Sequence, residues 1–82
     1  MELREEVLEK LIERTAQVFK KDPGELTEAT NYFDDLKAKS VQMVQIITVM
    51  EDAFDVQLNY MQLRRKKTIG EVADFIAEAC GA

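Results

Sequence analysis

Ser40 is the residue in this sequence whose type and position could carry chemistry. It lies where an acidic loop, residues 33–36, meets a long amphipathic stretch that begins at residue 40. At the start of a helix the first backbone N–H groups lack intrahelical partners, and the helix dipole favours an anion. An exposed serine hydroxyl at this point is therefore well placed to carry a covalently attached phosphate group.

The other residues give little support to a catalytic function. The sequence has no histidine, so neither a Ser-His triad nor a typical zinc site can form. Cys80 has no visible activating base, and we expect it to be a small buried hydrophobic residue. Asp34 and Asp35 are adjacent carboxylates, which make a weak metal site without further oxygen ligands. We therefore expect a protein that is not an enzyme and that holds no metal.

The spacing of apolar residues predicts an all-α fold. One proline and three glycines leave few helix breakers. A first helix should end near Lys21, because the Asp-Pro-Gly sequence that follows cannot continue it. Residues 22–39 then form a long connection. We expect Leu26, Phe33 and Leu36 to anchor this connection, with Phe33 filling the core.

Three further helices are predicted from local signals. The second should cover residues 40–53, because its apolar residues keep three-and-four spacing over more than three turns. Asn59 can cap a short third helix. Thr68 and Glu71 form a capping box that starts the last helix, which Gly81 can end. The inward faces should be Leu3, Val7, Leu8, Leu11, Thr15, Val18 and Phe19 in the first helix, Val41, Val44, Ile47, Met50 and Phe54 in the second, and Ile69, Val72, Ala73, Ile76, Ala79 and Cys80 in the last.

In order and spacing, these features resemble the acyl carrier proteins. A phenylalanine precedes an acidic-Asp-Leu step and then the serine, and the next helix ends in Glu-x-x-Phe at residues 51–54. The chain continues through Asp-Val-x-Leu at residues 55–58 to a last helix that begins Thr-hydrophobic-Gly-acidic at residues 68–71. The resemblance covers nearly the whole chain. It implies an acyl-carrier-like four-helix bundle, with three longer helices and a short third one, in a single domain over residues 1–82.

The resemblance also implies a function. In these carriers a serine at the start of the second helix holds 4′-phosphopantetheine through a phosphodiester, which places the attachment at Ser40. The arm would hold acyl groups as thioesters for fatty-acid, lipid or related secondary biosynthesis. The implied partners are a phosphopantetheinyl transferase, which uses coenzyme A, and enzymes that load and transfer acyl groups. Two alternatives stay open: an unmodified interaction module in which Ser40 only caps a helix, and an aminoacyl or peptidyl carrier.

The segment around Ser40 departs from the family pattern. Most members have Gly-x-Asp-Ser-Leu, whereas residues 37–41 are Lys-Ala-Lys-Ser-Val. Gln42 and Gln45 stand at positions that are commonly acidic, and the run of residues 64–67 makes the third-helix region basic. Val41 replaces leucine, and we expect it to anchor the core, as we expect of Phe54.

These departures have two interpretations. Lys37 and Lys39 could stabilise the phosphodiester, although exposed pairs contribute only on the order of 1 kcal/mol. They could instead invert the charge that a general transferase or synthase recognises, because like charges suppress wrong partners. We favour the second interpretation, which predicts a specialised carrier. The run at residues 64–67 is more often a solvated face than an anion site.

We expect partner enzymes to contact the surface around Ser40. Met43 and Tyr60 should lie near the surface on either side of the arm, although isolated exposed apolar residues are ordinary. The residues assigned to partner binding are Lys37, Lys39, Val41, Gln42, Met43, Gln45, Tyr60, Arg64 and Arg65.

Charge is unevenly distributed along the 82 residues. Residues 37–67 hold six basic and three acidic side chains, a balance of +3, within a chain of net charge −5. The basic middle either faces a partner or is random variation. The net negative charge argues weakly against nucleic acid. No stretch is long enough to span a membrane, no signal peptide is visible, and one cysteine suggests a reducing compartment. We expect a cytoplasmic monomer, and a mature mitochondrial or plastid form is also compatible.

Overall fold

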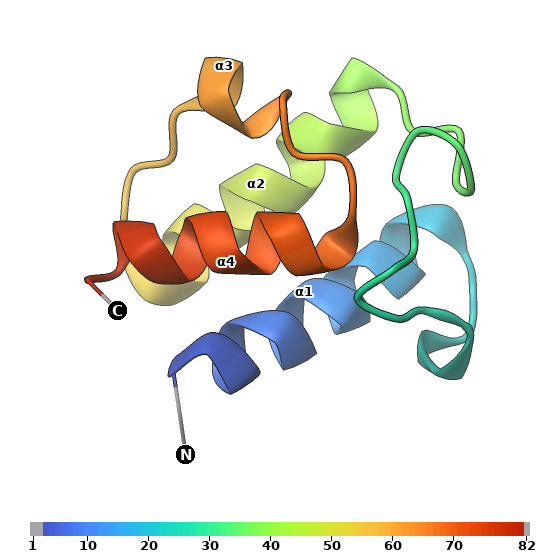
Figure 1. The fold of residues 1–82 in the computed structure, drawn as a ribbon, viewed down its shortest axis with the longest axis horizontal. Helices are drawn as coiled ribbons and strands as arrows, with labels where there is room; N and C mark the ends of the chain where they lie inside the picture. The colour runs from blue at the N-terminus through green and yellow to red at the C-terminus, as the bar shows by residue number, and fades with distance from the viewer. Residues whose placement is uncertain (1–2, 82) are drawn as a thin grey trace.

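The computed structural model describes residues 3–81, which form a helical bundle (Figure 1). The all-α fold, with three longer helices and a short third one, is confirmed. Helix α1 packs against both α4 and α2. None of the helices in residues 3–81 is long and apolar enough to cross a membrane. The elements are α1 (Leu3–Phe19), the 3-10 turn η1 (Pro23–Glu25), α2 (Ser40–Phe54), α3 (Tyr60–Leu63) and α4 (Ile69–Ala79).

Helix α1 ends two residues before the expected position. Phe19 is its last residue, and Lys20 turns the chain out of the helix with a positive φ of 56°. The Lys21 N–H still donates to the carbonyl of Ala16 at 2.9 Å, which closes the last turn. The face of α1 that enters the core consists of Val7, Leu11, Thr15 and Ala16.

The inward face of α2 is rotated from the one predicted. Val41 and Val44 were expected in the core, but their side chains are 68% and 46% exposed. Phe54 is only partly buried, so it is not the main anchor that we expected. Because α2 is rich in apolar residues, spacing alone did not fix which side faces inward. The buried residues of α2 are Met43, Ile46, Ile47 and Met50.

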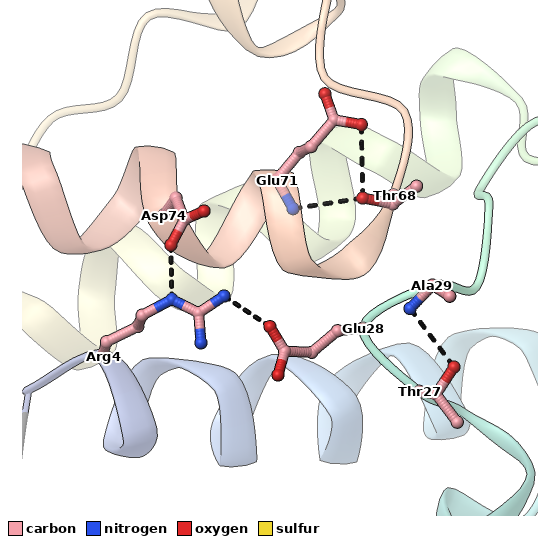
Figure 2. Close-up of polar contacts among 7 residues, drawn as sticks. All are labelled: Arg4, Thr27, Glu28, Ala29, Thr68, Glu71 and Asp74. Carbon is pink, nitrogen blue, oxygen red and sulfur yellow. Dashed lines mark hydrogen bonds and ion pairs between the residues drawn. The ribbon is translucent and has the colours of Figure 1, made fainter.

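The starts of α3 and α4 follow the predicted caps. The Asn59 side chain accepts a hydrogen bond from the Gln62 N–H at 3.2 Å. Thr68 Oγ1 accepts from the Glu71 N–H at 3.2 Å, and the Thr68 hydroxyl also donates to the Glu71 carboxylate (Figure 2). Gly81 takes the left-handed conformation, with φ 92°, that ends a helix. The core face of α4 is Ile69, Gly70, Val72, Ala73, Ile76 and Ala77, whereas Ala79 is exposed and Cys80 partly buried.

Tyr32, not Phe33, fills the core from the long connection. Tyr32 is fully buried and its hydroxyl lies 2.9 Å from Thr15 Oγ1, whereas Phe33 is 39% exposed. Burial raises the pKa of the Tyr32 phenol, and the hydrogen bond with Thr15 offsets part of this effect. Leu26 and Leu36 anchor the connection as expected. The hydrogen bond with Thr15 explains why Tyr32 rather than Phe33 enters the core. The buried Thr15 hydroxyl needs a hydrogen-bond partner, which phenylalanine cannot supply.

A short backbone pairing ties the connection to the start of α4. The Tyr32 N–H donates to the Lys67 carbonyl at 2.8 Å, and the Ile69 N–H donates to the Thr30 carbonyl at 3.0 Å. The Gly70 N–H donates to the Glu28 carbonyl at 2.9 Å. A Cβ atom at Gly70 would lie 3.2 Å from that carbonyl oxygen and 3.0 Å from Glu28 Cβ. Glycine therefore permits the close approach of these two segments.

Arg4 joins α1 to the same region. Its guanidinium forms ion pairs with Glu28 of the connection and with Asp74 of α4 (Figure 2). The hydrogen bond with Glu28, and then that with Asp74, raises the pKa of Arg4 further above its usual range. All three side chains are partly exposed, so salt should screen this link.

The contrast between two neighbouring aromatic residues gives a stability prediction. Tyr32→Ala should lower the free energy of unfolding by about 3–5 kcal/mol, because it empties a buried site. Phe33→Ala is the matched control and should cost less than about 1.5 kcal/mol, because much of its side chain is already in water. Denaturant unfolding of both variants measures the difference. Equal losses would contradict the assignment of Tyr32 to the core.

Candidate functional site

Ser40 lies in the first turn of α2 with its side chain exposed. The first hydrogen bond of the helix runs from the Met43 N–H to the Lys39 carbonyl, at 3.1 Å. The N–H groups of Ser40, Val41 and Gln42 therefore precede the helical ladder and mark the positive end of α2. The N-cap position belongs to Lys39. Ser40 is therefore the first residue inside the helix rather than its cap.

Gln42 completes the start of the helix. Its side-chain carbonyl Oε1 accepts a hydrogen bond from the Lys39 N–H at 2.9 Å, which is half of a capping box. The first turn of α2 has no acidic residue, so no carboxylate offsets the positive charge of the helix end. Gln42 is partly buried, so its side chain both supports the start of the helix and contributes to the surface beside Ser40.

A left-handed residue turns the connection into α2. Lys37 has φ 53°, in the left-handed region that favours glycine. The next residue, Ala38, donates its N–H to the Tyr32 carbonyl at 2.8 Å. Because Tyr32 is fixed in the core, this bond sets the point from which the chain enters α2. Ser40 is two residues further on.

Ser40 borders a groove with a volume of about 450 Å³. Its walls come from the end of the connection, the first turn of α2, and α3 with the segment that follows it. Apolar and charged side chains both contribute. The lining residues are Asn31, Phe33, Asp34, Ala38, Ser40, Met43, Tyr60, Leu63, Arg64 and Lys67.

The structure separates the predicted partner-binding residues by exposure. Met43 was expected near the surface but is 3% exposed, because it belongs to the buried face of α2 and meets the groove only at its wall. Tyr60 is partly buried and lines the same groove. The exposed members are Lys37, Lys39, Val41, Gln45, Arg64 and Arg65.

Sequence reasoning missed several residues at this site. Val44 and Met61 are exposed apolar side chains on α2 and α3. Asn31 was also missed, and it lines the groove beside Lys67 of the basic run because the backbone pairing brings their segments together. A local pattern could not reveal that pairing, since it joins residues far apart in the chain.

The two adjacent aspartates of the connection have separate surroundings. Asp35 accepts a hydrogen bond from the Asn31 N–H at 2.8 Å, so its carboxylate holds the loop together. Asp34 lines the groove, and its N–H donates to Asn31 Oδ1 at 2.9 Å. Within residues 3–81 there is no group of three or more His, Cys, Asp and Glu side chains that could hold a metal ion.

Comparison with known proteins identifies the family. The family model described as "Phosphopantetheine attachment site" matches residues 9–76. The acyl carrier protein of Rubrobacter xylanophilus is 32% identical over 75 residues, which cover 92% of this chain and 93% of that protein. The chain belongs to the acyl carrier protein family. The acyl carrier protein of Lactobacillus acidophilus is 32% identical, covering 88% of this chain and 90% of its own, and that of Phenylobacterium zucineum is 30% identical, covering 94% and 98%.

The prosthetic group of this acyl carrier protein is 4′-phosphopantetheine, held covalently. The residues around Ser40 fit such a group. An exposed hydroxyl, the positive end of α2 and the cations Lys37 and Lys39 form a setting that favours a phosphodiester. The groove beside Ser40 offers space for such an arm.

The backbone at Lys37 predicts a gain in stability on substitution by glycine. Left-handed backbone costs a residue with a Cβ about 1–2 kcal/mol, and glycine loses about 0.5–1 kcal/mol more entropy on folding. Lys37→Gly should therefore be more stable than Lys37→Ala by up to about 1 kcal/mol, measured by denaturant unfolding. Both variants remove the same charge, so the comparison isolates the backbone. A more stable alanine variant would contradict the role of this turn.

Proposed function

We propose that this acyl carrier protein holds acyl groups as thioesters on 4′-phosphopantetheine attached to Ser40, and delivers them to partner enzymes. One observation carries the assignment of the site. Ser40 is the only serine in the sequence, and it is exposed at the start of α2 within the matched region of the family model. The proposal extends to fatty-acid, lipid or related biosynthesis as the setting of this delivery.

Attachment would use the Ser40 hydroxyl as the nucleophile. Its oxygen forms the new bond to phosphorus while the pyrophosphate bond of coenzyme A breaks. Adenosine 3′,5′-bisphosphate leaves, and the transferase accepts the hydroxyl proton. The N-terminal turn of α2 and the neighbouring lysines stabilise the resulting anion. When bound, the group supplies a terminal thiol that holds the acyl cargo as a thioester.

The remainder of the chain would act by shielding and recognition. Phe33, Met43, Tyr60 and Leu63 give the groove an apolar lining that can cover part of the arm or cargo. Val41, Val44 and Met61 expose apolar surface on α2 and α3, which partner enzymes can bury. The exposed cations Lys37, Lys39, Arg64 and Arg65 add positive charge to this docking surface.

The attachment site is tested by intact mass. Incubation with coenzyme A, Mg²⁺ and a broad-specificity transferase should add the mass of one phosphopantetheine group to the wild type and nothing to Ser40→Ala. Thr48→Ala removes an exposed hydroxyl elsewhere on α2 and should be modified like the wild type. Modification of the Ser40→Ala protein would contradict the assignment. Failure of all three proteins to react would favour the unmodified interaction module.

The charge of the docking surface predicts the choice of transferase. An enzyme adapted to acidic carriers should modify the wild type slowly, because like charges oppose encounter. The double variant Lys39→Asp/Gln42→Glu should raise that rate about tenfold at low ionic strength, and the gain should shrink as salt screens it. Glutamate is chosen at position 42 because its carboxylate can still accept the hydrogen bond from the backbone N–H of residue 39.

The control for this experiment carries the same charge change on another helix. Lys10→Asp/Gln17→Glu alters two exposed side chains of α1 and should leave the modification rate near that of the wild type. If both double variants gain equally, net charge alone sets the rate. That result, or no gain from either, would contradict partner selection by the surface around Ser40.

A further inference from the structure

Two cations face the groove that Ser40 borders. Arg64 and Lys67 line it together with Ser40, whereas Arg65 and Lys66, which lie between them in the sequence, do not. Asp34 is the only carboxylate among the lining residues, so the charged side chains of the groove sum to one positive charge. The basic run at residues 64–67 is therefore divided, with two members at the groove and two elsewhere.

The backbone around these cations is fixed by hydrogen bonds. Arg64 caps α3, and its N–H donates to the Tyr60 carbonyl at 3.0 Å. The Lys67 carbonyl accepts from the Tyr32 N–H, which ties it to the connection that leads into α2. The backbone that carries these two side chains is thus anchored, so only side-chain freedom is lost when they bind an anion.

An anion attached to Ser40 would enter this groove at a high local concentration. A phosphodiester carries one negative charge and cannot diffuse away from its serine, so even weak partners in reach are occupied. Arginine binds phosphate oxygens with a planar fork of donors, and lysine binds them as a point charge. The chemistry of the two cations therefore matches the group that the proposed function places beside them.

We propose that Arg64 and Lys67 bind the phosphodiester on Ser40 and hold the first part of the arm against the groove between α2 and α3. This inference rests on the attachment at Ser40. It gives two members of the basic run at residues 64–67 an intramolecular role, because the positive charges of Arg64 and Lys67 would balance the negative charge of the phosphodiester. Partner enzymes then meet an arm that is docked at its phosphate, and they must displace Arg64 and Lys67 to reach it.

The test follows the phosphorus nucleus by NMR. Holo wild type, Arg64→Gln/Lys67→Gln and Arg65→Gln/Lys66→Gln are compared, each first checked by mass for one group on Ser40. In the wild type the phosphorus resonance should differ from that of an unfolded holo sample, and added NaCl should move it toward that position. The Arg64→Gln/Lys67→Gln variant should lose most of this shift. The Arg65→Gln/Lys66→Gln control, which removes the same charge, should keep it.

A second readout observes the cations themselves. In the wild type, conversion from apo to holo should shift the side-chain N–H resonance of Arg64 and leave that of Arg65 in place. Equal phosphorus shifts in the two double variants, or an unmoved Arg64 resonance, would overturn the inference. It would also be overturned if the contact appeared only after loading with a carboxylate-bearing acyl group, since the cargo would then be the anion. A protein that gains no mass at Ser40 would overturn the proposed function together with this inference.

Discussion

The site depends on a short backbone pairing between residues 28–32 and residues 67–70. Three hydrogen bonds of 2.8–3.0 Å hold the long connection to the start of α4, and Gly70 allows the two backbones to approach. The ion pairs of Arg4 link α1 to the same place. This pairing brings Asn31 and Lys67 to one wall of the groove, and the bond from Ala38 to Tyr32 sets the entry into α2. Ser40 therefore owes its surroundings to contacts between segments far apart in the sequence.

Local signals in the sequence were enough to predict the helices but not every buried face. The start of α2 and the caps at Asn59 and Thr68 depend on neighbouring residues, and all three were predicted. The inward face of α2 was not, because apolar residues occur on both of its sides and only tertiary packing, which includes its contact with α1, selects Met43 and Ile46 over Val41 and Val44. Tyr32 was missed although a signal existed, since Thr15 on the apolar face of α1 required a hydrogen-bonding partner. The groove was beyond prediction, because it requires the tertiary pairing.

Apart from Val41, the departures from the family pattern all make the charge around Ser40 more positive. Relative to the Gly-x-Asp-Ser-Leu pattern that the resemblance implies, lysines stand at the glycine and aspartate positions before Ser40, and four cations follow α3 at residues 64–67. At Lys37 the backbone takes a left-handed conformation that suits glycine, so a charged side chain stands at a turn that strains it. The first turn of α2, Lys39 and the groove cations all favour an anion at Ser40, and the exposed cations beyond them oppose basic partners. Under the proposed function, one surface would thus both stabilise the phosphate on Ser40 and restrict which enzymes approach it.

The central claim is that Ser40 carries the prosthetic arm of a working acyl carrier. The most direct measurement is fragmentation mass spectrometry of the intact protein purified from its native host. The account predicts one phosphopantetheine group per chain, located on the fragment that contains Ser40, with acyl cargo on part of the population. Protein from the host that carries no group at all, or carries it on a fragment without Ser40, would contradict the account.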